Sequence, residues 1–508
     1  MTPSVLIVGA GPTGLVLALW LAKLGVKLRI IDKAAEAGTT SRAVAVQART
    51  LEFYRQVGFA DPVVNGGVQV AAGNLWVGGA RVARLPLGSM GEGLSPFPFA
   101  LMFGQDEHER LLASELDRLG VQVERRTELL GYEQSARAVR ARLKRRDGSE
   151  EHVDAAYLAG CDGAHSIVRQ VSGAEFAGGT YSGVFYVADV RAAGPAVNEE
   201  IHVDLEEADF IAAFPLKGGG RLRVVGPASW DPAARQREMT FDDVAPRASR
   251  NLGLAISSVN WFSTYRVHHR VAARFRAGRA FLLGDAAHLH SPVGGQGMNT
   301  GIGDAVNLAW KLAAVLKREA PESLLDTYEP ERIRFARRLV ATTDRAFTFI
   351  VKQGALARRV RTRLVPFILP IAVRTRAFRR LLFHVVSQIG VQYRHSALSR
   401  GAAGNVRGGD RLPWIELAGG TDNFEPLRSL KWQAHVYGEA APGLAQACAE
   451  LGIALHSFAW RDTMQRAGLL RGAFYLVRPD GYVGLADSRG EARVLREYWD
   501  NIGRPWPR

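Results

Sequence analysis

The stretch VLIVGAGPTG at residues 5–14 places four apolar residues directly before three glycines with the spacing Gly-x-Gly-x-x-Gly. The apolar run predicts a β-strand, and the segment Thr13–Leu24 after it predicts an apolar helix. Val26–Ile31 predicts the next strand, so the chain opens as a βαβ unit of about 30 residues. We therefore expect an α/β fold built on a parallel sheet.

The three glycines of this turn have different physical roles. Gly9 permits the tight turn, Gly11 lets a pyrophosphate approach the backbone, and Gly14 lets the helix pack closely on the strand. The pattern therefore predicts a dinucleotide site. A glycine turn with a purely structural role is the alternative.

The residues around the turn suit the same ligand. Pro12 and Thr13 open the helix, whose free N–H groups and positive dipole end favour a phosphate. Asp32 lies 18 residues after Gly14 at the end of the second predicted strand, and Lys33 follows it. A carboxylate at this position can accept hydrogen bonds from a ribose.

Composition limits the class of protein. The chain has 508 residues, of which 47% are hydrophobic and 23% charged, so it can bury a large core and is not disordered. Cys161 and Cys448 are far apart and in no paired motif, which predicts a reducing, cytoplasmic location. We expect neither a signal peptide nor a transmembrane segment, because no apolar run reaches about 18 residues.

The net charge of +15 is unevenly distributed. Between Asp344 and Asp410 there is no acidic residue, whereas thirteen residues are Lys or Arg. Such a run suits a nucleic-acid or anionic-membrane patch, or simply a solvated helical face. No nucleic-acid-binding motif accompanies it, so we favour the solvated face, expect no nucleic-acid partner, and leave a weak anionic-membrane contact open.

A second motif, CDGAHS at residues 161–166, follows the predicted strand His152–Leu158. An Asp-Gly pair at the end of a strand can be no more than a turn. Asp162 therefore becomes a candidate for cofactor binding only in company with the other motifs.

The third motif begins with Gly284-Asp285-Ala286-Ala287-His288, after the predicted strand Arg279–Leu283. The strand delivers Asp285, whose carboxylate can bind a ribityl hydroxyl. The loop at 291–299 is rich in glycine and precedes the predicted helix Thr300–Lys317, so its N–H groups can face an anion.

These three motifs, in this order and at these spacings, resemble the group A FAD-dependent aromatic hydroxylases, which have the para-hydroxybenzoate hydroxylase fold. The resemblance covers residues 1 to about 395. It implies a Rossmann-like FAD-binding domain with an inserted β-sheet substrate domain. It also implies that FAD is bound tightly but without a covalent bond.

The resemblance also implies roles for individual residues. Asp32, where many relatives have Glu, would bind the adenosine ribose, and Arg42 would contact an FAD phosphate. Gln105 would contact the ribityl chain, and Asp162 belongs to a motif shared between FAD and the nicotinamide cofactor. The residues that would bind FAD or line its ring are Gly9, Gly11, Pro12, Thr13, Gly14, Asp32, Lys33, Arg42, Gln105, Asp162, Asp285, Pro292, Gly295, Gly297, Met298 and Asn299.

The last hundred residues resemble the C-terminal thioredoxin-like α/β domain of phenol hydroxylases and polyketide aromatic hydroxylases, which ends in a hairpin like Arg478–Gly481. This segment has no Cys-x-x-Cys motif, so we expect no dithiol chemistry. The glycine-rich segment Gly401–Asp410 is expected to be a linker. The expected domains are an FAD-binding domain with a helical extension (1–70, 100–180 and 270–395), a substrate-binding β-sheet domain (71–99 and 181–269) and the C-terminal domain (405–508).

The chain has a single dinucleotide fingerprint, whereas disulfide reductases and many Baeyer–Villiger enzymes usually carry a second one for NADPH. The resemblance implies that NAD(P)H binds transiently, reduces FAD and leaves. Reduced flavin and O2 would give a C4a-hydroperoxide that hydroxylates a phenolic or polycyclic aromatic substrate. A Baeyer–Villiger, epoxidising or ring-opening oxygenase is the alternative on this fold, and a non-catalytic membrane-surface flavoprotein is a more remote one.

The sequence assigns no catalytic base to help ionise a phenol, whose free pKa is about 10. Candidates occur in the strand-rich segments, where each also suits a structural role, and one proline would line the flavin. These residues are Tyr186, His202, Tyr265 and His268, together with Pro292.

No metal site is expected, because His288 and His290 have no accompanying Cys or carboxylate ligands at a suitable spacing. The resemblance implies that the partners are a small aromatic substrate and O2. A homodimer is the default of the family that the chain resembles.

Overall fold

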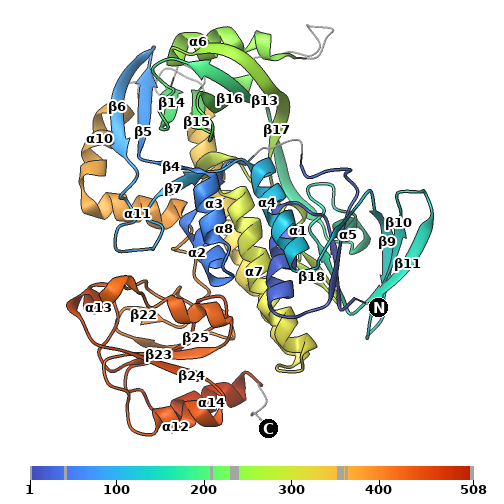
Figure 1. Ribbon diagram of the computed structural model, residues 1–508, viewed down its shortest axis with the longest axis vertical. Coiled ribbons are helices and arrows are strands. Elements are labelled where there is room, and N and C mark those ends of the chain that lie inside the picture. The colour runs from blue at the N-terminus through green and yellow to red at the C-terminus, as the bar shows by residue number, and fades with distance from the viewer. Residues whose placement is uncertain are drawn as a thin grey trace.

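The computed structural model describes residues 3–38, 43–205, 210–228, 239–351, 360 and 364–503. The described chain is mixed α/β and forms five sheets. Figure 1 shows the C-terminal sheet at one end of the molecule and the largest sheet at the other, with long helices between them. Within the described residues, no helix is both long enough and apolar enough to span a bilayer.

A six-stranded, mostly parallel sheet carries the N-terminal glycine turn. Its central strand β1 (Val5–Val8) lies between β12 (Tyr157–Gly160) and β2 (Leu28–Asp32) and is parallel to both. The helix α1 (Pro12–Lys23) follows β1, so the predicted βαβ opening is confirmed. The other strands of this sheet are β8 (Val123–Arg125), β18 (Arg276–Ala277) and β19 (Ala280–Leu282).

Two helices that are apolar over most of their surface form the centre of the molecule. Residues 14–21 of α1 and residues 299–314 of α7 (Gly297–Leu316) are all buried. A helix that is hydrophobic on every side must lie within a core. The two helices pack on each other, and α4 (Gln105–Arg118) packs against α1 from another side.

One predicted strand is divided in the structure. The expectation that His152–Leu158 forms a single strand is wrong, because β11 (Glu150–Ala155) and β12 belong to different sheets. In β11 the partly exposed face alternates with a buried one, whereas β12 is buried throughout. The three-stranded antiparallel sheet of β11 also contains β9 (Glu128–Gln134) and β10 (Val139–Lys144).

The largest sheet has eight strands, and α6 (Ala245–Leu252) covers one of its faces (Figure 1). The predicted hairpin of Phe210–Pro215 and Arg221–Val225 is confirmed as an antiparallel pair. The strands, in sheet order, are β20 (His288–Leu289), β17 (Ala255–Ala272), β13 (Phe176–Ala193), β16 (Arg221–Ala228), β15 (Phe210–Pro215), β14 (Ile201–Leu205), β5 (Ala72–Val77) and β6 (Ala80–Pro86).

Alternate residues of this sheet point to opposite faces. Tyr186 and Ala188 of β13 belong to a buried cluster with Ala248 of α6, and we call this side the outer face. Phe185 and Asp189 alternate with them and lie on the other side, the inner face. The two faces therefore have separate environments.

The C-terminal part forms a second six-stranded sheet, and the expected linker Gly401–Asp410 is part of it. This expectation is wrong because β21 (Arg400–Ala403) pairs in parallel with β26 (Val483–Asp487). A Cβ on Gly401 would lie 2.1 Å from the carbonyl oxygen of Ala486, so this glycine permits close packing. The remaining elements are β22 (Val406–Arg407), β23 (Gln433–Tyr437), β24 (Ala454–Phe458), β25 (Phe474–Val477), α12 (Leu444–Glu450), α13 (Asp462–Arg466) and α14 (Ala492–Asn501).

Buried ion pairs join this C-terminal sheet to the central helices. Glu331 of α8 (Tyr328–Val351) accepts hydrogen bonds from Arg478 at 2.8 and 3.0 Å and from Lys311 at 2.8 Å. Arg478 also donates to Asp480 at 2.6 Å. Burial lowers the pKa of Lys311 to about 8 in spite of Glu331. The two parts of the chain are thus joined by charges that have no access to water.

Candidate functional site

The glycine turn leaves open space at one of its three glycines. A Cβ on Gly9, whose φ is +100°, would lie 2.2 Å from the carbonyl oxygen of Cys161. A Cβ on Gly14 would lie 1.9 Å from the carbonyl oxygen of Gly9. Over Gly11, by contrast, no atom of the described residues lies within 4 Å of that position, apart from the adjoining residues of the chain. Close packing therefore requires glycine at positions 9 and 14, whereas the backbone at Gly11 is left open to a ligand.

The start of α1 is suited to an anion. Gly11 is its N-cap and provides no side-chain cap, Pro12 occupies the first turn, and that turn contains no acidic residue. The N–H groups of the first turn of a helix have no partner within the helix, and the positive end of its dipole lies there. A phosphate above Gly11 would accept hydrogen bonds from these N–H groups and would be stabilised by the positive end of the dipole.

Asp32 is held beside this turn by backbone groups. Its Oδ2 accepts a hydrogen bond from the N–H of Ala10 at 2.6 Å, and its Oδ1 accepts one from Ala34 at 2.7 Å. An ionised carboxylate can accept about four hydrogen bonds, so Asp32 retains acceptor capacity for a ribose. Lys33 is exposed next to it.

Gln105 links Ala43 to Gly38 through hydrogen bonds, directly to Ala43 and by way of Glu109 to Gly38. Its Oε1 accepts from the N–H of Ala43 at 3.2 Å, and its Nε2 donates to Glu109 at 2.8 Å. Glu109 also accepts from the N–H of Gly38 at 2.6 Å, and burial raises its pKa. Arg42, the predicted phosphate ligand, lies outside the described residues.

The three sequence motifs meet in the structure. A Cβ on Gly284 would lie 2.6 Å from Oγ1 of Thr13, and one on Gly301 would lie 2.3 Å from the same oxygen. The start of α1, the turn after β19 and the first turns of α7 are therefore in direct contact. The contact of Gly9 with Cys161 adds the second motif to this cluster.

Asp162 caps a helix in the described structure. Its Oδ1 accepts from Oγ of Ser166 at 2.5 Å, and its Oδ2 accepts from the N–H of Val168 in α5 (Ile167–Val171) at 3.2 Å. Burial raises the pKa of Asp162. Arg169 lies on the same helix and donates to the carbonyl of Ala286 at 2.9 Å. The second motif is therefore hydrogen-bonded to the third motif, which begins at Gly284.

A buried carboxylate holds the turn that presents Asp285. The two oxygens of Asp304 accept from the N–H of Gly284 at 3.0 Å, pair with Nε2 of His288 at 2.8 Å, and accept from Arg332 at 2.5 Å. Burial acts to raise the pKa of Asp304, but the charge of Arg332 and the hydrogen bonds with His288 and Gly284 outweigh it, and the pKa is lowered. Asp285 itself is exposed on this fixed turn.

Asn299 has a structural role that the sequence did not indicate. Its Oδ1 accepts from the N–H of Gln47 at 2.9 Å and from Thr50 at 2.8 Å. Its Nδ2 donates to the carbonyls of Ala45 and Gly295, both at 2.9 Å. The side chain therefore has its hydrogen-bonding capacity filled by protein. A ligand ring next to Asn299 would therefore contact the backbone of this residue and not its side chain.

The glycine-rich loop leads into α7 without a side-chain cap. Gly295 has φ of +62°, and a Cβ there would lie 2.7 Å from that of Ala45. Gln296 is the N-cap residue of α7, and its amide donates to the carbonyl of Val386 at 2.7 Å. The first-turn N–H groups of α7 are therefore also suited to negative charge. Pro292 is exposed in this loop, and Gly297 and Met298 are half-buried.

His290 was not predicted to contribute to the cofactor site, yet it faces the start of α7. Its Nδ1 lies 2.8 Å from the carbonyl of Ser291, an acceptor, so Nε2 carries no proton in the neutral ring. Burial lowers the pKa of His290 to about 4. Among the described residues, the buried Nε2 has no hydrogen-bond partner, and it lies 3.6 Å from the Cβ position of Gly297. It is thus available to a ligand.

Two of the predicted catalytic candidates lie on the outer face of the eight-stranded sheet. Tyr186 packs in the α6-covered cluster with Trp76 and stacks on Phe262. His202 bonds to Trp76 at 2.9 Å and to Asn198 at 2.7 Å, and burial lowers its pKa to about 4. Their placement across the sheet from the motifs argues for structural roles.

The other two candidates lie on β17. Tyr265 belongs to a cluster with Phe185 and Phe210 on the inner face. His268 bonds through Nδ1 to Oγ1 of Thr180 at 2.7 Å. Tyr265 is therefore the candidate whose side chain shares a face with the motif-bearing part of the molecule.

The inner face of the eight-stranded sheet packs against the backbone at Ala43 and Val44, close to the cofactor motifs. Arg223 is fully buried, pairs with Asp189 at 2.7 and 2.8 Å, and donates to the carbonyl of Ala43 at 2.7 Å. Phe214 packs against Val44 and neighbouring apolar residues. This buried ion pair could not be predicted from the sequence, because its two members are 34 residues apart in the chain.

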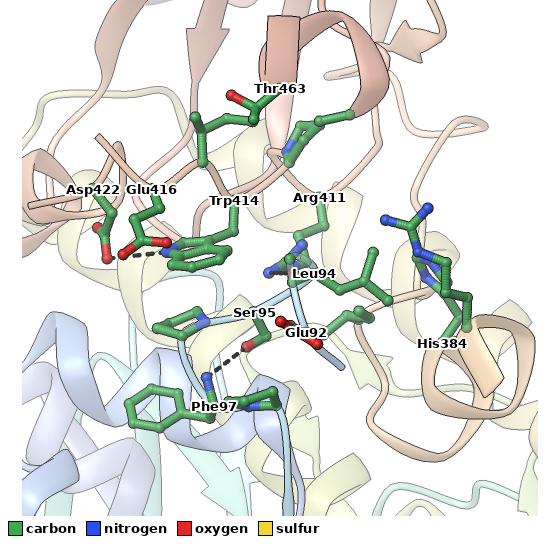
Figure 2. Close-up of a pocket in the computed structure, with 18 of the residues that line it drawn as sticks. Glu92, Leu94, Ser95, Phe97, His384, Arg411, Trp414, Glu416, Asp422 and Thr463 are labelled. Atoms are coloured by element: carbon green, nitrogen blue, oxygen red, sulfur yellow. Dashed lines mark hydrogen bonds between the residues drawn. The ribbon is translucent and has the colours of Figure 1, made fainter. Parts of the chain in front are cut away.

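A large cavity of about 1840 Å³ lies elsewhere, between residues 89–98, α11 (Arg376–Val386) and the C-terminal part. Figure 2 shows Trp414 and Arg411 on one side of it and Phe97 on the other. None of the described cofactor residues lines this cavity. Among the described residues, no group of three or more His, Cys, Asp or Glu could hold a metal ion.

Comparison with known proteins agrees with this assembly of motifs. The family model described as "FAD binding domain" matches residues 2–343. A 6-methylpretetramide 4-monooxygenase from Streptomyces rimosus is 32% identical, and the alignment covers 97% of this chain and 92% of the relative. A pentachlorophenol 4-monooxygenase from Sphingobium chlorophenolicum is 31% identical over 84% of this chain and 78% of its own.

The fold is also similar to that of solved enzymes. The anhydrotetracycline hydroxylase OxyS from Streptomyces rimosus superposes with a TM-score of 0.80 at 28% identity, covering 100% of both chains. The similarity therefore includes the C-terminal sheet as well as the motif-bearing part.

Proposed function

We propose that this chain, which belongs to the FAD binding domain family and is a flavin-dependent monooxygenase, hydroxylates a phenolic or polycyclic aromatic substrate. NAD(P)H is the co-substrate typical of the family. One observation carries the proposal: the open space over Gly11, at the uncapped start of α1, is in the same cluster as the turn that presents Asp285.

The residues present fit FAD. The N–H groups after Gly11 would hold the pyrophosphate, and Asp32 would bind the adenosine ribose. Asp285 would bind the ribityl chain, and the backbone at 295–299 would contact the ring. His290 would accept a hydrogen bond at its Nε2, because that nitrogen is buried and has no partner among the described residues.

When bound at these residues, FAD would supply the redox chemistry between NAD(P)H and O2. The N–H groups at the start of α7 would stabilise negative charge that develops beside them. The apolar inner face, including Phe185 and Phe214, would contact the aromatic substrate and exclude water from it. Tyr265 would orient the phenol hydroxyl, and we assign no residue to its deprotonation.

The experiment is a substrate panel. FAD-loaded protein is mixed with NADH or NADPH and a series of phenols and polycyclic phenols, and both coenzyme oxidation and product mass are followed. We expect at least one phenol to accelerate coenzyme oxidation and to gain one oxygen atom. Coenzyme oxidation that no phenol changes would favour a Baeyer–Villiger, epoxidising or ring-opening oxygenase instead.

Further proposals concern organisation. The two free cysteines suit a reducing cytoplasm, and a homodimer is the default of the family. We propose an FAD-binding domain at 1–70, 100–180 and 270–395, a substrate domain at 71–99 and 181–269, and a C-terminal domain that begins near residue 400 with β21.

A further inference from the structure

The most exposed large apolar side chains of the described residues are concentrated on two neighbouring helices. These are α10 (Val365–Arg374), with Leu364 at its N-cap, and α11. Six side chains here are 47–70% exposed, and none elsewhere in the described chain exceeds 46%. They are Leu364, Phe367, Ile368, Ile371, Leu381 and Val385.

The exposed residues follow the helical period. Residues 364, 367, 368 and 371 are spaced three, four and seven apart, so they share one face of α10. Leu381 and Val385 are four apart on α11. The opposite sides of the helices are anchored, because Val373 and Phe383 are buried. Each helix therefore presents an apolar stripe away from the core.

Uncompensated positive charge borders these stripes. Arg374 and Arg376 are exposed next to the stripes. Arg379 and Arg380 are half-buried and, with Arg376, line the cavity between α11 and the C-terminal part. Within the described residues none of the four forms an ion pair with a carboxylate, and the sequence from 345 to 409 has no acidic residue. Figure 1 shows α10 at the outer edge of the molecule beside β6. We call the six apolar side chains together with the exposed Arg374 and Arg376 the apolar–cationic surface.

We propose that the apolar–cationic surface binds the face of an anionic lipid bilayer. Helices with an apolar stripe bordered by arginines lie in the plane of the interface, with the stripe among the upper acyl chains and the cations at the headgroups. Binding of this kind needs both components, because apolar area and charge each contribute only part of the affinity. The surface supplies both on adjacent helices.

Other partners fit this surface less well. A nucleic acid would pair with the arginines but would leave the aliphatic stripes in water. A second copy of the chain, related by a two-fold axis, would bring the same arginines against one another without carboxylates to offset them. An anionic bilayer complements the stripes and the charges together. The proposal does not depend on which aromatic compound the enzyme oxidises.

Vesicle co-sedimentation of the FAD-loaded full chain tests the proposal. We expect binding at about 0.15 M salt to phosphatidylcholine vesicles that contain about 30% phosphatidylserine, and little binding to phosphatidylcholine alone. The variant Phe367→Ser/Ile371→Ser should weaken binding at least about tenfold, through lost apolar burial. Arg374→Gln/Arg376→Gln should weaken it by about fivefold for each arginine.

Matched controls keep the test specific. Val259→Ser/Leu470→Ser removes two apolar side chains that are also exposed but lie elsewhere, and Arg137→Gln/Arg146→Gln removes two exposed arginines of another sheet. Both controls should bind vesicles like the wild type, and all variants should retain FAD and the activity on a water-soluble phenol.

Three results would overturn the proposal. They are no binding to anionic vesicles, equal binding by Phe367→Ser/Ile371→Ser and the wild type, and a dimer in light scattering that this variant abolishes while vesicle binding is absent. The last would assign the surface to a second copy of the chain. Because activity on a soluble phenol is measured separately, failure here is distinguishable from failure of the proposed function.

Discussion

The N–H of Gly284 donates to the buried carboxylate of Asp304 at 3.0 Å. This bond attaches the turn after β19 to the middle of α7, and the same carboxylate holds Arg332 of α8 at 2.5 Å. The exposed Asp285 is therefore presented by a turn that the buried side chain of Asp304 holds in place.

Gly11 and Gly14 should behave differently when changed to alanine. Gly14→Ala places a Cβ 1.9 Å from a carbonyl oxygen and should cost about 1–3 kcal/mol of stability in the FAD-free protein. Among the described residues, the Cβ of Gly11→Ala meets no atom within 4 Å beyond its own neighbours in the chain, so stability should change by less than about 0.5 kcal/mol. It should nevertheless weaken FAD binding at least about tenfold. Urea unfolding and fluorescence titration with FAD measure the two effects, and wild-type FAD affinity in Gly11→Ala would contradict the assigned pyrophosphate site.

Asp285→Ala should release FAD and leave the fold intact. The side chain is exposed, so its removal should change stability by less than about 0.5 kcal/mol. A hydrogen bond to a charged group contributes about 1.5–3 kcal/mol, so the Kd for FAD should rise about 10- to 150-fold. Asp61→Ala, an exposed acid away from the motifs, is the control. Unchanged FAD affinity in Asp285→Ala would reject the role given to this carboxylate.

Asp304→Asn should destabilise the protein itself. The substitution leaves the charge of Arg332 buried without its carboxylate, and breaking a buried pair costs about 3–5 kcal/mol. Asp106→Asn, which breaks an exposed pair with Arg110, should cost no more than about 1 kcal/mol. Urea unfolding of both variants gives the comparison, and a similar small cost for each would show that Asp304 does not hold the turn.

The stability of the protein should fall on acidification. Burial lowers the pKa of His108 to about 3, and its Nε2 bonds to the hydroxyl of Tyr54 at 2.8 Å. Below pH 6.5 the unfolded chain takes up a proton at this histidine that the folded chain does not, so stability is lost as pH falls. This contribution reaches at most about 2 kcal/mol at pH 5. The loss of unfolding free energy between pH 7.5 and pH 5, measured by urea unfolding, should be smaller in His108→Gln than in the wild type. An equal loss in the two proteins would refute the role given to His108.

The sequence predicted what depends on neighbouring residues. Val5–Val8, the glycine turn and Asp32 lie within one βαβ unit, so their spacing alone indicated a strand, a phosphate-binding helix start and a ribose-binding acid. The contact of Thr13 with Gly284 and Gly301 could not be predicted in this way, because it joins distant parts of the chain by side-chain packing.

Alternation in strands predicts two faces but not what covers each of them. Tyr186 and His202 looked equivalent to Tyr265 as candidates, yet packing against α6 places the first two on the outer face. Glycine content misled for a related reason. Gly401 is needed for close approach to Ala486 of β26, and this requirement cannot be recognised until the partner strand is known.

Oxygen insertion is the most direct test of the central claim that the chain hydroxylates an aromatic ring. FAD-loaded protein would be mixed with NAD(P)H, the best phenol of the panel and ¹⁸O2, and the product examined by mass spectrometry. We expect one ¹⁸O atom in each product molecule and one coenzyme molecule oxidised for each product molecule formed. Coenzyme oxidation that yields hydrogen peroxide and leaves every phenol unlabelled would contradict it.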